Sequence, residues 1–117
     1  MGLSTHVLDT MHGCPAAGMQ VTLYRMDGLQ AHLLQAVTLN ADGRNPGGML
    51  IANEALQTGH YRLTFDVSSY FKQRGVDLPE PSFLGLVTLD FGVADPMQHY
   101  HVPLLVSPWS YATYRGS

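Results

Sequence analysis

The chain contains little cysteine and little charge. Cys14 is the single cysteine in 117 residues, so no intrachain disulfide can form, and a reducing compartment such as the cytoplasm is expected. Lysine and arginine together number six, and the formal net charge is -3. A chain with so few cations offers no basic surface to a phosphate backbone, so nucleic acid is not an expected partner.

Long apolar runs are also missing. No stretch approaches the ~20 residues that cross a bilayer, so no membrane association is expected. The first ten residues, MGLSTHVLDT, have neither the basic region nor the apolar run of a secretion signal. A secreted chain whose signal had been removed would look the same, and that alternative stays open.

The chain is rich in apolar residues. Its hydrophobic fraction of 45 % is ample for a core, whereas its charged fraction of 13 % is low for a freely solvated surface. A chain of this length buries about two-thirds of its unfolded surface, so it needs no disulfides to fold. We therefore expect one domain over residues 1–117, with part of its surface covered by self-association.

Alternating apolar and polar residues dominate the sequence and predict strands. Such runs cover residues 5–10, 19–26, 31–39, 59–67, 83–93, 99–107 and 111–115. The stretch SSYFKQRG, residues 68–75, has a serine cap and a glycine stop and predicts one short helix. About eight short strands with frequent turns are typical of an all-β sandwich.

Histidines occupy an unusual place in this pattern. In HYHVPLLV, one strand face carries the apolar residues Tyr100, Val102, Leu104 and Val106, and the opposite face carries His99 and His101. His6 likewise lies opposite the core-facing Thr5 and Val7. Imidazoles beside apolar residues on an outer face suggest a partly covered concave surface at which histidine titrates near neutral pH.

Two interpretations of this surface compete. A His-x-His pair with a third histidine is an arrangement that binds zinc, but no acidic residue or cysteine is placed as a further ligand. Alternatively, Arg44 in the turn-rich loop ADGRNPGG and Arg115 near the end of the chain would, with the histidines, bind a planar anionic ligand rich in carbonyl oxygens.

The end of the chain is the third unusual feature. The residues YATYRGS follow directly on the β-branched and aromatic run HVPLLVSPWS, so they are expected to be ordered although chain ends usually fray. Ser117 is not expected to act as a nucleophile, because nothing follows it to build an oxyanion hole.

Three segments carry a resemblance to a known family. HVLDTMHGCPAAGMQVTLY near the start, DGR in the middle and HYHVPLLVSPWSYATYRGS at the end resemble the 5-hydroxyisourate hydrolases, the transthyretin-related enzymes of urate breakdown. The resemblance implies a transthyretin-like sandwich of two four-stranded sheets with one short helix. It also implies a homotetramer with active sites in the channel between its dimers.

The same resemblance implies the function. It implies hydrolysis of 5-hydroxyisourate, a small-molecule substrate, to 2-oxo-4-hydroxy-4-carboxy-5-ureidoimidazoline, without metal or other cofactor. It implies catalytic roles for His6, Arg44 and His101, and substrate binding by Tyr114, Arg115, Gly116 and Ser117. The sequence leaves open which histidine is the general base. The alternative function is a transthyretin-like carrier that binds a small molecule without catalysis.

Overall fold

Strands account for most of the chain, as the alternating sequence predicts. The structure is a computed structural model that describes residues 2–117. Its strands are β1 (Gly2–Asp9), β2 (Cys14–Pro15), β3 (Gln20–Asp27), β4 (Gln30–Thr38), β5 (Ile51–Ala52), β6 (Gly59–Asp66), β7 (Leu86–Val93), β8 (Tyr100–Val106) and β9 (Tyr111–Thr113). Its helices are the 3₁₀ helix η1 (Asn53–Ala55) and the α-helix α1 (Val67–Gln73).

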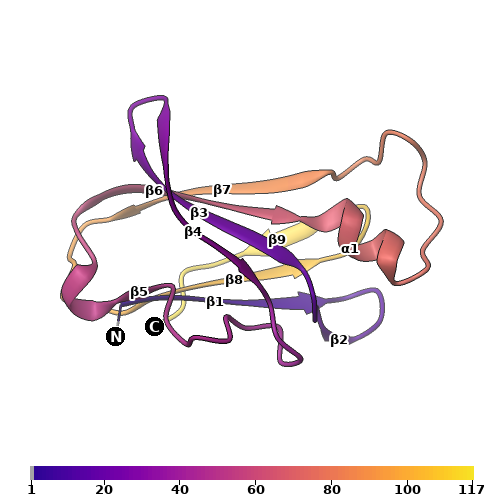
Figure 1. Cartoon of the computed structure of the whole chain (residues 1–117), viewed down its shortest axis with the longest axis horizontal. Coiled ribbons are helices and arrows are strands. Elements are labelled where there is room, and N and C mark those ends of the chain that lie inside the picture. Colours follow the sequence, from indigo (N-terminus) through magenta and orange to yellow (C-terminus); the bar gives the residue numbers. More distant parts are fainter. Residues whose placement is uncertain (1) are drawn as a thin grey trace.

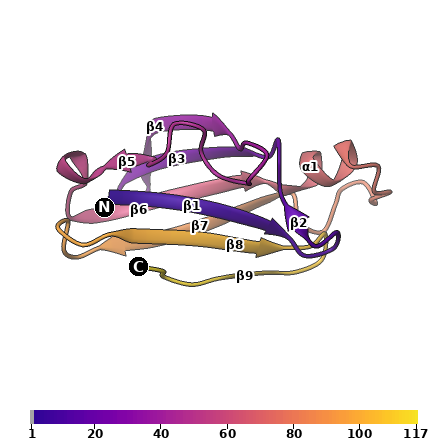
Figure 2. The same cartoon turned by 90° about the horizontal axis from the view of Figure 1, so that it is seen from below.

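The strands form two sheets that face each other (Figures 1 and 2). One sheet has the order β2-β1-β8-β9, with the short β5 also paired to β1, and the other has the order β4-β3-β6-β7. β1 and β8 run parallel, and the remaining pairs are antiparallel. The predicted sandwich of two four-stranded sheets and one short α-helix is confirmed, and the short strand β5 and the 3₁₀ helix η1 are additions.

The core lies between the inner faces of the sheets. On β8, the side chains predicted to face inward are at most 7 % exposed: Tyr100, Val102, Leu104 and Val106. On β1, Thr5 and Val7 are buried as well. Each fully buried aliphatic side chain contributes roughly 1.5–3 kcal/mol. This burial fixes which face of β1 and β8 turns outward, and so it fixes the side on which the histidines lie.

The helix α1 follows directly on β6. Its N-cap is Asp66, whose carboxylate accepts a hydrogen bond from the backbone N–H of Ser69 at 3.3 Å. The prediction of a serine cap is therefore wrong by two residues, because Asp66, an equally good cap, precedes Ser68. The predicted glycine stop agrees with the structure, since Gly75 has φ 84°, a conformation that favours glycine.

A buried carboxylate joins β1 to α1 at the end of the sandwich remote from the chain termini (Figure 1). Asp9 is fully buried and accepts hydrogen bonds from the backbone N–H of His12 at 2.9 Å, from His12 Nδ1 at 2.6 Å and from the Tyr70 hydroxyl at 2.8 Å. Burial acts to raise the pKa of Asp9, but these bonds outweigh it and hold the pKa below its ordinary value.

Neither helix in residues 2–117 has the length and hydropathy needed to cross a membrane.

Candidate active site

The parallel pairing of β1 with β8 brings the two predicted catalytic histidines onto one outer face. Ser4 lies opposite His101, and His6 lies opposite Pro103, two residues further along each strand. Since side chains alternate along a strand, Ser4, His6 and His101 all point away from the core. The two histidines are far apart in the sequence, and this pairing places them on neighbouring strands.

The loop that carries Arg44 is fixed against β1. The backbone N–H of Val7 donates to the carbonyl of Gly43 at 3.0 Å, and Arg44 forms an antiparallel bridge with His6. A Cβ atom on Gly43 would lie 2.6 Å from the Val7 carbonyl oxygen, and the backbone of Gly43 has a φ of 70°. The close approach therefore requires glycine, and it places the Arg44 side chain beside the histidine face.

The C-terminal tail is ordered because it pairs with β8. The N–H of Gly116 donates to the carbonyl of His101 at 2.7 Å, and the N–H of His101 donates to the carbonyl of Gly116 at 3.2 Å. Figure 2 shows the tail following β8 back toward the end of the sandwich where the chain begins. The expectation of an ordered end agrees with this pairing, which places the terminal Ser117 beside the histidines.

These segments enclose a cavity of 540 Å³ on the outer face. It is lined by Ser4, Thr5, Arg44, Asn45, Gly48, Met49, His99, His101 and Ser117. Three predicted site residues, Arg44, His101 and Ser117, therefore share it. His6 and Tyr114 border a smaller hollow of 150 Å³ on the same sheet.

Ser4 and His99 also line this cavity, and neither was among the residues to which the resemblance assigned a role. The placement of His99 on the outer face of its strand was the available signal for that residue. For Ser4 no signal was available, because its importance depends on the register between β1 and β8.

Arg115 is oriented differently from its neighbours in the tail. Its guanidinium donates to the Gln98 side chain and to the His99 carbonyl, both at 3.1 Å, and lies 4.4 Å from the centre of the Tyr100 ring. Among residues 2–117 no ion pair involves Arg115. Arg115 ties the tail to the residues just before β8.

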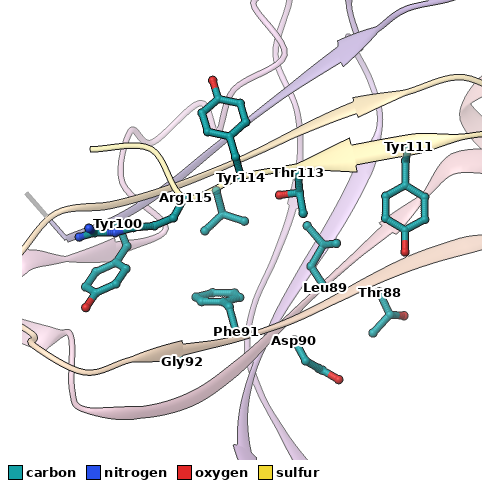
Figure 3. A pocket seen from close by; sticks show the side chains of 11 residues that line it. Thr88, Leu89, Asp90, Phe91, Gly92, Tyr100, Tyr111, Thr113, Tyr114 and Arg115 are labelled. Atoms are coloured by element: carbon teal, nitrogen blue, oxygen red, sulfur yellow. The ribbon is translucent and has the colours of Figure 1, made fainter.

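A second, larger hollow lies between β7 and β9. It measures 620 Å³ and is lined largely by apolar and aromatic side chains, with Arg115 at one end (Figure 3). In Figure 3 the Tyr114 ring points away from Phe91 and Leu89, toward the outer face of the sheet. This hollow contains no histidine, and its single carboxylate, Asp90, is paired with Arg62. It therefore lacks the imidazoles to which the acid–base roles are assigned.

The environment favours the neutral form of both predicted catalytic histidines. Burial is the largest cause that lowers the pKa of His6 and of His101 below 6.5, and the positive charge of Arg44 lowers both further. At His6 the backbone and carboxylate of Asp42 partly oppose this effect. At neutral pH the site therefore holds two neutral imidazoles beside one guanidinium.

The described residues do not provide the geometry that a metal site requires. Across residues 2–117, no three side chains of histidine, cysteine, aspartate or glutamate come together in an arrangement that could hold a metal ion. The outer face thus combines imidazoles with arginine, a hydroxyl and the chain terminus, a set suited to binding an anionic or carbonyl-rich ligand.

Comparison with known proteins identifies the family. The profile of the HIUase/Transthyretin family matches residues 3–116. The chain belongs to this family. It is 52 % identical over 115 residues to a protein of Rhizobium meliloti named 5-hydroxyisourate hydrolase 2, a match that covers 98 % of this chain and 95 % of the relative.

Solved structures of the family have the same fold. The 5-hydroxyisourate hydrolase of Klebsiella pneumoniae superposes with a TM-score of 0.81 at 34 % identity and full coverage of both chains. A structure named (S)-allantoin synthase gives a TM-score of 0.93 at 43 % identity and covers 99 % of this chain, which spans 43 % of that longer one. The family predicted from three short segments is thus confirmed over nearly the full length.

Proposed function

We propose that this chain hydrolyses 5-hydroxyisourate in the cavity formed by β1, β8, the Arg44 loop and the tail. The activity is the one for which its relative at 52 % identity is named. The observation that carries the assignment of the site is the convergence of two neutral imidazoles, His6 and His101, with the Arg44 guanidinium on one outer face.

The reaction requires three things that this site can supply. Water must lose a proton as it adds to a carbonyl carbon of the ring, and a neutral imidazole accepts a proton well near neutral pH. The carbonyl oxygen gains negative charge, which a guanidinium or an N–H donor stabilises. The flat substrate must also be held in position, and the planar fork of Arg44 suits its oxygens.

The C-terminal tail completes the proposed site. Ser117 lines the cavity of His101, and Tyr114 lines the hollow of His6, so both are assigned to substrate binding. Gly116 contributes its backbone by pairing with His101. Arg115 acts by holding the tail in place through the bonds described above.

We further propose that the protein is a homotetramer with its active sites in a channel between dimers. Several large apolar side chains are exposed to solvent in the single chain, among them Leu29, Leu33, Phe83, Leu86, Met97 and Trp109, each at least 58 % exposed. Exposed apolar surface of this kind marks interfaces between subunits. In sedimentation, the active protein should have a mass of about four times 12.8 kDa, and a fully active monomer would contradict the channel.

A cytoplasmic location is proposed on the single cysteine, which forms no disulfide within the chain. Fractionation of the native cells should recover the protein with cytoplasmic markers, and recovery in a secreted fraction would contradict it.

The function is tested by preparing 5-hydroxyisourate in situ from urate and following the decay of its ultraviolet absorbance. Substoichiometric protein should accelerate the decay through many turnovers. The alternative, a carrier on the same scaffold, binds the compound and leaves its decay unchanged or slowed. Accelerated decay supports the hydrolase, and saturable binding without acceleration supports the carrier.

The same assay tests the absence of a cofactor. Activity should be unchanged after exhaustive chelation and dialysis, because the groups proposed for the chemistry are all side chains of the protein. Loss of activity that zinc restores would instead support the zinc interpretation of the histidines.

A further inference from the structure

The hydroxyl of Ser4 lies between two histidine rings of β8 and the residue before it. Its Oγ is 2.7 Å from Nδ1 of His101 and 3.2 Å from Nε2 of His99. The two rings are nearly parallel, with centroids 6.4 Å apart and an angle of 12° between their planes. A serine hydroxyl has one proton, so it donates to one ring and accepts from the other.

The two distances indicate the direction of this chain of bonds. O–H···O hydrogen bonds are most often about 2.7–2.8 Å long, whereas N–H···O bonds are most often about 2.9–3.0 Å and extend to about 3.2 Å. The short contact fits a bond from Ser4 Oγ–H to a bare Nδ1 of His101. The longer contact fits a bond from His99 Nε2–H to Ser4 Oγ.

The other ring nitrogen of His99, Nδ1, supports the same direction of donation, from His99 to Ser4 and from Ser4 to His101. His99 Nδ1 is buried and has no hydrogen-bond partner among the described residues. A neutral imidazole has its proton on one nitrogen, and buried N–H groups without an acceptor are rarer in proteins than acceptors with an unused lone pair. The proton of His99 therefore belongs on Nε2, where Ser4 accepts it, and the proton of Ser4 is directed to His101.

We propose that Ser4, oriented by His99, is a positioning residue that fixes the proton of neutral His101 on Nε2, so that His101 presents an N–H donor to the substrate. This inference rests on the proposed hydrolysis in the same cavity. The ring of His101 lines that cavity, and its Nδ1 is occupied by Ser4, so Nε2 is the nitrogen left for a ligand.

In this proposal His6 and His101 have different roles in the reaction. His6 takes a proton from water as the water oxygen bonds to the ring carbonyl carbon, and the Nε2–H of His101 donates a hydrogen bond to the carbonyl oxygen as it becomes negative. When the ring C–N bond breaks, protonated His6 returns the proton to the leaving nitrogen. His101 keeps its own proton throughout, and no further reactant is needed.

Nitrogen NMR of the full-length protein labelled at histidine tests the tautomer directly. Above the pKa of the ring, the shifts of Nδ1 and Nε2 and their couplings to hydrogen show which nitrogen carries the proton, and the spectrum of His101→Gln assigns the resonances. The parent should have His101 protonated on Nε2. Ser4→Thr, which keeps the hydroxyl, should show the same His101 tautomer. Protonation on Nδ1 in the parent would overturn the proposal.

The Ser4→Ala variant should show a mixture of His101 tautomers and a kcat about tenfold lower, the scale of one lost orienting hydrogen bond. Ser69→Ala removes an exposed hydroxyl from α1, far from the cavity, and should leave both readouts at parent values. An unchanged tautomer together with an unchanged kcat in Ser4→Ala would refute the positioning role.

A pair of substitutions at His101 separates a hydrogen-bond donor from a base. Glutamine places an N–H donor near the position of Nε2 but cannot accept a proton from water, whereas leucine can do neither. His101→Gln should therefore retain at least about tenfold more kcat/KM than His101→Leu. Equal loss in the two folded variants would show that His101 acts as the base.

The tautomer is read without substrate, so this test does not depend on turnover. A parent protein that fails to hydrolyse 5-hydroxyisourate would contradict the proposed function and leave the assignment of the His101 proton standing. A parent that hydrolyses it with the proton on Nδ1 would contradict the positioning role and leave the function standing.

Discussion

The substitution Gly116→Ala probes how closely the tail is fitted to the catalytic strand. A Cβ atom at position 116 would lie 3.1 Å from Cδ2, 3.2 Å from Cβ and 3.3 Å from the carbonyl oxygen of His101. Carbon atoms prefer separations of about 3.5–4.0 Å, so the methyl group forces the tail and His101 apart by a few tenths of an ångström. Relieving the contact strains the two backbone bonds that hold the tail.

The expected loss of stability is small and the expected loss of activity is larger. The two half-buried hydrogen bonds between Gly116 and His101 are together worth about 1–3 kcal/mol at most, and neither supports the core. A displacement of 1 Å in a catalytic group can cost about 100-fold in rate, so a shift of a few tenths of an ångström should lower kcat/KM by roughly tenfold.

Kinetics of 5-hydroxyisourate decay and urea unfolding measure the two effects on the same samples. Gly85→Ala is the matched control, because a Cβ atom at that position would have no neighbour within 4 Å. It should leave activity at the parent value. Parent activity in a folded Gly116→Ala protein would show that the fit between the tail and His101 does not matter for catalysis.

Three further predictions concern charge, the tail and the buried carboxylate. Because the charge of Arg44 lowers the pKa of His6 and of His101, Arg44→Met should raise both pKa values and move the acidic limb of the kcat/KM profile to higher pH; an unmoved or downward-shifted limb would contradict this. Deletion of residues 114–117 should abolish most hydrolysis in a protein that circular dichroism and size exclusion show to be folded and assembled, whereas a merely frayed end would leave the rate unchanged. Tyr70→Phe removes one donor from buried Asp9 and should cost about 1.5–3 kcal/mol in urea unfolding without changing kcat; a loss below about 0.5 kcal/mol would show that the bond contributes little.

The sequence was most informative about strands and their faces. Alternation correctly assigned the buried and outer faces of β8, because the period of two follows directly from strand geometry. The same alternation placed His6 and His101 on outer faces, and the Asp-Gly turn marked the loop of Arg44. These features depend on local sequence, which is why they could be predicted.

Features that depend on register between distant strands could not be predicted. Ser4 meets His101 because β1 runs parallel to β8 in one particular alignment, over a separation of 97 residues. The turn of Arg115 toward Tyr100 depends in the same way on where the tail pairs with β8. The start of α1 was misplaced for a simpler reason, since serine and aspartate are both good caps and the sequence offered both.

The proposed function depends on the two outer-face imidazoles of His6 and His101. Its most direct test is the rate of 5-hydroxyisourate decay with a folded, assembled protein that lacks both rings, the double variant His6→Asn, His101→Leu. We expect a decay indistinguishable from that without protein, under conditions in which the parent accelerates it many-fold. Turnover by the double variant at the parent rate would place the chemistry elsewhere on the molecule and refute catalysis by His6 and His101.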